Sequence, residues 1–122
     1  MAEILVVDDD SQVREVLKIL LSMAGHEVYE ASTAKKAIES YKQHPVDIII
    51  TDILMPDKDG LELIQEVRRL NPGAKIIAMS GGGQIGSQEY LSWAKKFGAK
   101  HHLSKPIPRK ELLEVVEAVL NA

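Results

Sequence analysis

The 122-residue sequence contains no cysteine. A disulfide framework, a thiolate metal site and a cysteine nucleophile are therefore excluded, which fits a reducing cytoplasm without requiring one. The sequence also lacks the run of about 20 apolar residues that a membrane-spanning helix needs. Because no basic leader precedes its first apolar run, we expect a soluble protein that is not secreted, and we place it in the cytoplasm.

An excess of basic charge is missing as well. The sequence has 15 Lys and Arg residues against 18 Asp and Glu residues, which gives a formal net charge of -3. A protein that holds a nucleic-acid backbone usually presents a strongly positive surface, so direct DNA or RNA binding is not expected. The length and the hydrophobic content of 45% suit one compact domain, and we assign residues 1–122 to it.

Strand-like and helix-like segments alternate along the chain five times. Five runs are predicted to be strands, the second of them short and mixed in character: residues 4–7, 27–30, 46–50, 75–79 and 99–103. Between the runs, apolar residues recur at helical spacing, for example at Val13, Val16, Leu17, Leu20 and Leu21. Strands that are apolar throughout are typical of a parallel sheet with helices on both faces. We therefore predict an α/β fold with a doubly wound, five-stranded parallel sheet.

Residues that favour helix ends fall between these segments. Thr33 is placed to cap the start of the second helix, and Gly25 and Gly98 are placed to end helices in the left-handed conformation. Trp93 and Phe97, near the end of the fourth helix, are expected to lie wholly or partly in the core.

Polar residues follow the strands at the edge where sheets of this kind bind ligands. They are Asp8, Asp9 and Asp10 after the first strand, Asp52 after the third, Ser80 after the fourth and Lys105 after the fifth. Crowded carboxylates repel one another unless a cation lies among them, and oxygen ligands without nearby histidine or cysteine favour Mg²⁺. Together with the lysine and the hydroxyl, such a site suits an anion with several oxygens, and we predict a phosphoryl group.

Each of these residues alone has a simpler structural explanation. Adjacent aspartates before a helix are more often caps than metal ligands, and Asp10 is expected to be such a cap. Ser80 alone would indicate a turn, and Asp52 alone could cap the turn that follows it. The functional interpretation depends on all of these features meeting at one edge of one sheet.

The sequence resembles the receiver domains of two-component response regulators over essentially its whole length. The resemblance rests on residues 4–9, on residues 52–56 followed by 59–63, on Ser80 and on Lys105 with Pro106, all in the family's order and spacing. It implies a flavodoxin-like (βα)5 fold with the strands in the order 2-1-3-4-5.

The resemblance also implies roles for the polar residues. Asp52 would be the phosphoacceptor, and Asp8 and Asp9 would be the acidic pair of the metal site. Asp9 would be a direct Mg²⁺ ligand, together with Asp52 and the backbone carbonyl of Leu54. The phosphoryl group would come from a histidine kinase or a histidine phosphotransfer protein, and the domain would catalyse its own phosphorylation and dephosphorylation. Mg²⁺ and Lys105 would neutralise the charge as two anions meet.

A switch follows from the same resemblance. Ser80 would gain a hydrogen bond once Asp52 carries the phosphoryl group, which would shift a two-state equilibrium and alter the surface of the fourth helix, fifth strand and fifth helix. His102 stands where the family often has an inward-turning Tyr or Phe, and we expect acid to oppose switching by charging this ring. The altered surface would contact a downstream effector domain or protein, and two copies of the chain can pair through it.

Three other functions share parts of this pattern. A receiver-like interaction module that signals without phosphorylation commonly lacks at least one of Asp9, Asp52, Ser80 and Lys105. A flavodoxin-like FMN carrier needs a phosphate-binding loop after the first strand, where this chain has acids instead. A metal-dependent phosphatase with an aspartyl intermediate needs a second acid two residues after the nucleophile, where Leu54 stands.

Overall fold

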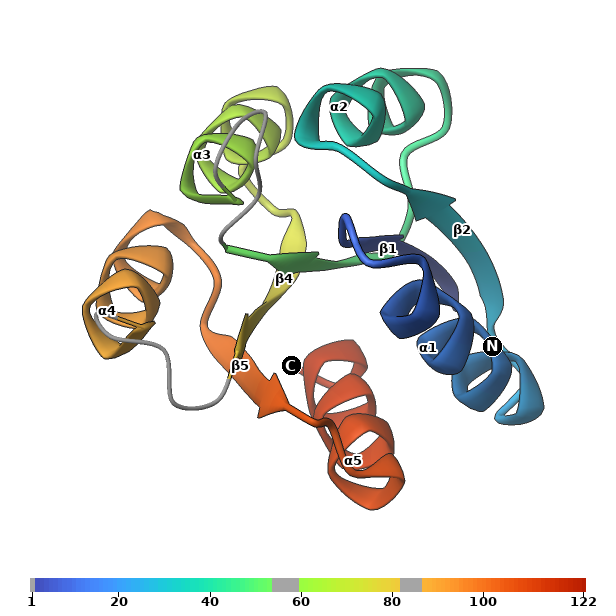
Figure 1. Cartoon of the computed structure of the whole chain (residues 1–122). Helices are drawn as coiled ribbons and strands as arrows, with labels where there is room; N and C mark the ends of the chain where they lie inside the picture. The colour runs from blue at the N-terminus through green and yellow to red at the C-terminus, as the bar shows by residue number, and fades with distance from the viewer. Residues whose placement is uncertain (1, 54–59, 82–86) are drawn as a thin grey trace.

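The computed structural model describes residues 2–53, 60–81 and 87–122, without the side chains of residues 87–91 (Figure 1). Strands and helices alternate through these ranges, as the hydrophobic pattern predicts. The elements are β1 (Glu3–Val7), α1 (Ser11–Met23), β2 (Glu27–Ala31), α2 (Ala34–Gln43), β3 (Ile48–Asp52), α3 (Gly60–Leu70), β4 (Lys75–Gly81), α4 (Ser87–Phe97), β5 (His101–Lys105) and α5 (Arg109–Leu120). No helix within the described ranges is both long and apolar enough to cross a membrane.

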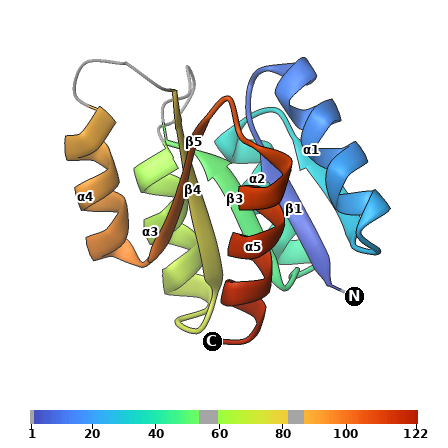
Figure 2. The same ribbon diagram turned by 90° about the horizontal axis from the view of Figure 1, so that it is seen from below.

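The five strands form one parallel sheet in the order β2-β1-β3-β4-β5, which confirms the predicted topology. Helices α1 and α5 cover one face of the sheet, and α2, α3 and α4 cover the other (Figures 1 and 2). Side chains of β1 alternate between the two layers: Leu5 and Val7 pack in the core under α2, α3 and α4, and Ile4 and Val6 pack in the core under α1 and α5. Burial on both faces explains why the central strands are apolar throughout.

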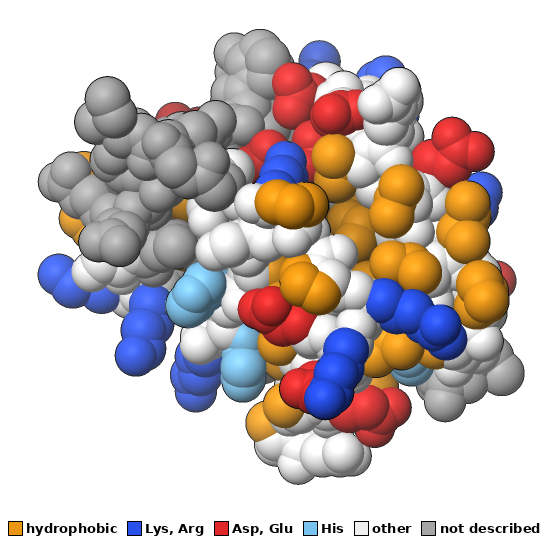
Figure 3. All heavy atoms as spheres, turned by 60° about the horizontal axis from the view of Figure 1, so that its bottom comes forward, with side chains coloured by type: hydrophobic (Ala, Val, Ile, Leu, Met, Phe, Trp, Pro, Cys, Tyr) orange, Lys and Arg blue, Asp and Glu red, His pale blue; other side chains and the backbone are white. Residues whose placement is uncertain are grey.

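The predicted apolar stripe of α1 is only partly buried. Leu17 and Leu21 lie in the core, but Val16 is 54% exposed, so the prediction was wrong for this residue. Consecutive helical residues point about 100° apart, and Leu17 takes the direction that faces the sheet. Ile19 and Met23 are exposed on the same helix. Figure 3, which views the side of the molecule that carries α1 and α5, shows hydrophobic side chains at the surface.

Trp93 is also more exposed than predicted. Its neighbour Ala94 is fully buried and takes the core-facing position of α4, which turns the indole away so that 44% of Trp93 is exposed. Phe97 is partly buried against the core, as expected.

Strands β3, β4 and β5 each end two residues later than the apolar pattern indicates. Strands β3 and β5 each begin and end two residues beyond their predicted bounds, and β4 continues to Gly81. The ladder extends past the last apolar residue because Asp52 pairs with Met79, Ser80 with Ser104 and Gly81 with Lys105. Asp52, Ser80 and Lys105 are therefore held in the sheet itself, where its hydrogen bonds fix their backbone positions.

The predicted helix ends are confirmed. The Asp10 carboxylate accepts a hydrogen bond from the backbone N–H of Gln12 at the start of α1, and the Thr33 hydroxyl accepts one from Lys36 at the start of α2. Gly25 and Gly98 have φ values of +92° and +129° just after α1 and α4, in the region where glycine avoids the strain of a side chain.

Candidate functional site

The carboxyl ends of β1, β3 and β5 bring an acidic cluster and a lysine together. Asp8 follows β1, while Asp52 and Lys105 are the last residues of β3 and β5. One carboxylate oxygen from each of Asp8, Asp9 and Asp52 lies within 4.8 Å of the other two. The structure thus brings together the three acids that the sequence predicts for a metal site.

Lys105 bridges two of these acids. Its Nζ donates a hydrogen bond to Asp52 Oδ2 at 3.0 Å and lies 2.6 Å from Asp8 Oδ2 in an ion pair. Burial by itself would lower the pKa of the Lys105 ammonium, but its contacts with the carboxylates of Asp8 and Asp52 outweigh burial and raise that pKa above its usual value. Lys105 is therefore charged at neutral pH.

The cluster is deeply buried for a set of carboxylates. Asp8 is fully buried, Asp52 is 7% exposed and only Asp9 is an exposed residue. Asp8 Oδ1 accepts a hydrogen bond from the backbone N–H of Asp10 at 2.9 Å. Asp8 Oδ2 accepts no aligned hydrogen bond from the described residues, which leaves the ion pair with Lys105 as its compensation. Burying a carboxylate oxygen without a hydrogen-bond donor is costly, and a nearby cation offsets that cost.

This donor set fits Mg²⁺. It consists of carboxylate oxygens, with one acid accessible to solvent, and Mg²⁺ prefers oxygen ligands and keeps several of its waters. Asp8, Asp9 and Asp52 are the residues that could hold such an ion. The predicted backbone ligand Leu54 lies outside the described residues.

Ser80 and His102 occupy different environments. Ser80 is 3% exposed and lies on β4, the strand between β3 and β5. The residue before Ser80 pairs with Asp52 of β3, and the residue after it pairs with Lys105 of β5. Its hydroxyl is thus at the same edge of the sheet as the acids. His102 is exposed on β5, so in this structure its ring is turned to solvent rather than inward.

Two residues that position the site were not predicted from the sequence. Arg14 of α1 donates a hydrogen bond from Nη1 to the backbone carbonyl of Asp8 at 2.7 Å. Gly60 begins α3 against the end of β3, where a Cβ would lie 2.6 Å from Ile53 Cα and closer still to the carbonyl oxygen of Asp52. Gly60 belongs to the motif that carries the family resemblance, which is a signal for it, but no spacing in the sequence reveals the partner of Arg14.

Comparisons with known proteins show which family the chain resembles in sequence and fold. The family model described as response regulator receiver domain matches residues 4–117. The chain is similar to the chemotaxis protein CheY of Thermotoga maritima, with 38% identity over 117 residues that cover 95% of each chain. It is 40% identical to the DNA-binding transcriptional regulator NtrC of Azospirillum brasilense over 99% of this chain and 24% of that protein. The crystal structure of a response regulator receiver domain protein from Clostridium thermocellum superposes with a TM-score of 0.91 at 29% identity, over 99% of this chain and 95% of that one.

Proposed function

The chain belongs to the response regulator receiver domain family, and from this membership we propose that it is a signalling switch that takes a phosphoryl group onto Asp52. The observation that carries the proposal is the contact of one lysine ammonium with two buried carboxylates, in a cluster whose third acid is exposed. Such a site attracts cations and, once its acids are neutralised, a multiply charged anion.

The proposed reaction is an in-line displacement at phosphorus. A carboxylate oxygen of Asp52 forms the new P–O bond, while the bond from phosphorus to the donor's histidine nitrogen breaks and its electron pair stays on that nitrogen. Mg²⁺, when bound by Asp8, Asp9 and Asp52, supplies positive charge that offsets the repulsion between the two anions. The Lys105 ammonium lies 3.0 Å from Asp52 Oδ2, so it is close enough to pair with the phosphoryl oxygens once they are bound to Asp52.

Ser80 is proposed to detect the product. Its hydroxyl is buried at the same edge of the sheet, one register step from both Asp52 and Lys105. A hydrogen bond from Ser80 to the phosphoryl group would exist only in the phosphorylated protein, and a contact made in only one state shifts the equilibrium toward that state. In that state His102 would have to move inward from the exposed position that it has here.

The partners belong to the same proposal. The donor would be a histidine kinase or a histidine phosphotransfer protein, and we propose that it binds beside the site. A pocket of about 500 Å³ opens next to Lys105, between Val13 and Val16 of α1 and the residues Pro106 and Ile107 after β5. The output would pass through α4, β5 and α5 to an effector domain or protein, or to a second copy of the chain. We place these events in the cytoplasm.

The test is phosphorylation by a small donor. The protein is incubated with acetyl phosphate in the presence of either Mg²⁺ or EDTA, and its intact mass is measured. The proposal expects the addition of one phosphoryl group with Mg²⁺ and little or none with EDTA. A folded protein that gains no mass in either condition would instead be a receiver-like interaction module that signals without phosphorylation.

A further inference from the structure

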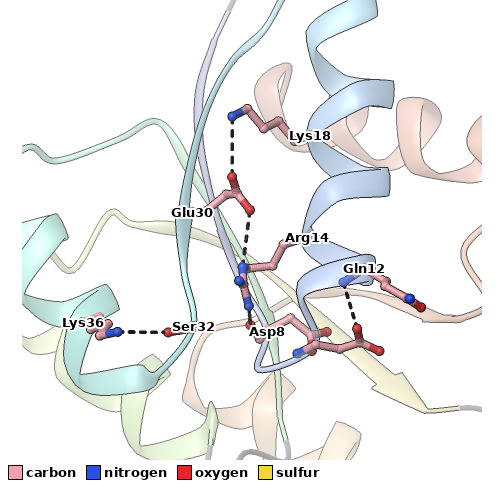
Figure 4. A network of polar contacts seen from close by, with 8 residues as sticks. Asp8, Gln12, Arg14, Lys18, Glu30, Ser32 and Lys36 are labelled. Carbon is pink, nitrogen blue, oxygen red and sulfur yellow. Dashed lines mark hydrogen bonds and ion pairs between the residues drawn. The ribbon is translucent and has the colours of Figure 1, made fainter.

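Arg14 joins the acidic site at the end of β1 to the neighbouring edge strand β2. Figure 4 shows its guanidinium between Asp8, at the end of β1, and Glu30 of β2. Nη1 donates to the Asp8 carbonyl oxygen at 2.7 Å, and Nε donates to Glu30 Oε1 at 3.3 Å. Glu30 Oε2 also lies 3.5 Å from Lys18 Nζ, one turn further along α1. With 17% of its side chain exposed, Arg14 is well shielded from water for an arginine.

The hydrogen bond from Arg14 to the carbonyl of Asp8 bears on the orientation of Asp9, the next residue in the chain. None of the described residues holds the carboxylate of Asp9 by a hydrogen bond or an ion pair, so its direction toward Asp8 and Asp52 depends on the backbone from which the side chain departs. The carbonyl of Asp8 and the N–H of Asp9 belong to one planar peptide unit. A donor that fixes this carbonyl therefore fixes the plane from which the Asp9 side chain departs.

We propose that Arg14 is a positioning residue that sets the orientation of Asp9 in the metal site by holding the peptide between Asp8 and Asp9, and that Glu30 aims the guanidinium. This inference rests on the proposed function, because it assigns Asp9 to metal binding. Arginine suits the role because its rigid fork bonds two acceptors at once, which the single ammonium of a lysine cannot do in the same geometry.

A purely electrostatic role for Arg14 predicts the opposite effect. A positive charge near a cation site repels the cation, so removing that charge should strengthen Mg²⁺ binding. Removing a residue that positions a ligand should weaken it, typically by about 10- to 100-fold. The sign of the change therefore separates the two explanations.

The experiment measures the Mg²⁺ dissociation constant by calorimetry for the full chain and its variants, with no phosphodonor present. We expect Arg14→Met to bind Mg²⁺ about tenfold or more weakly, and Arg14→Lys, which keeps the charge and loses the fork, to be weakened as well. Glu30→Gln should weaken binding less. Lys18→Met is the matched control, because it removes a positive charge from the same network without touching Asp8, and its affinity should be unchanged or slightly higher.

Several outcomes would overturn the inference. Tighter binding by Arg14→Met, or an unchanged affinity in Arg14→Lys, would reduce Arg14 to a distant charge. Urea unfolding in EDTA shows whether each variant is folded. If Arg14→Met does not fold, the Mg²⁺ affinity of Arg14→Lys decides whether Arg14 is a positioning residue. Failure of the proposed function is a separate result: Mg²⁺ binding that depends on Arg14, in a protein that acetyl phosphate does not modify, would refute phosphorylation and retain the positioning role.

Discussion

Replacing Lys105 with methionine removes the cation that holds two buried acids together. Methionine keeps an unbranched side chain and loses the ammonium that contacts Asp8 and Asp52. Breaking a buried ion pair by removing one partner usually costs about 3–5 kcal/mol, because a charge stays buried without compensation. Since 22% of the Lys105 side chain is exposed, water offsets part of this cost. We expect Lys105→Met to lower the free energy of unfolding by about 2–3 kcal/mol in the absence of Mg²⁺.

Mg²⁺ should reverse much of this loss. In the native protein the Lys105 ammonium pairs with Asp8 and Asp52, so it competes with a cation for the charge of these acids, and the variant has no such competitor. We expect the variant to bind Mg²⁺ about tenfold more tightly, which corresponds to about 1.4 kcal/mol. Because a ligand that binds only the folded state stabilises it, saturating Mg²⁺ should raise the stability of the variant more than that of the native protein.

Urea unfolding followed by circular dichroism measures both effects, in EDTA and in a series of MgCl₂ concentrations. Lys100→Met is the control, since Lys100 is exposed and contacts neither acid, and its stability should stay within about 0.5 kcal/mol of the native value. A Lys105→Met variant as stable as the native protein in EDTA would refute the first expectation. Equal stabilisation of both proteins by Mg²⁺ would refute the second.

Three further predictions concern the same edge of the sheet. Gly60→Ala should cost about 3 kcal/mol in urea unfolding, because its Cβ meets backbone that cannot move aside, whereas Gly73→Ala, with its nearest atom 3.6 Å away, should be nearly neutral; equal effects would contradict the packing argument. Asp9→Ala should raise the Mg²⁺ concentration for half-maximal phosphorylation by acetyl phosphate about 10- to 100-fold, and an unchanged requirement would move the ligand elsewhere. Because the folded-state pKa of Lys105 is raised above 10.5, its stabilisation is complete below that pH and is lost as the pH rises through the folded value. The stability difference between the native protein and Lys105→Met should therefore be the same at pH 7 and 9 and shrink near pH 11, and a gap already closed at pH 9 would refute this.

The hydrophobic pattern predicted the fold because buried parallel strands and amphipathic helices leave clear periodicities. It failed at the strand ends, since the apolar run stops while the hydrogen-bonded ladder continues through Asp52 and Lys105. It also failed for Val16 and Trp93, because an apolar residue beside the core-facing position carries the same signal as one within it. The contact of Arg14 with a backbone carbonyl could not be predicted, because only the folded turn after β1 brings the two together.

Mapping the modified residue shows whether Asp52 accepts the phosphoryl group. The protein is treated with acetyl phosphate and Mg²⁺, then with borohydride, which reduces an aspartyl phosphate to homoserine, and its peptides are analysed by mass spectrometry. We expect homoserine at position 52, and no modification in Asp52→Asn under the same conditions. Homoserine at Asp8 or Asp9 with an unmodified Asp52, or undiminished phosphorylation of Asp52→Asn, would show that Asp52 is not the acceptor.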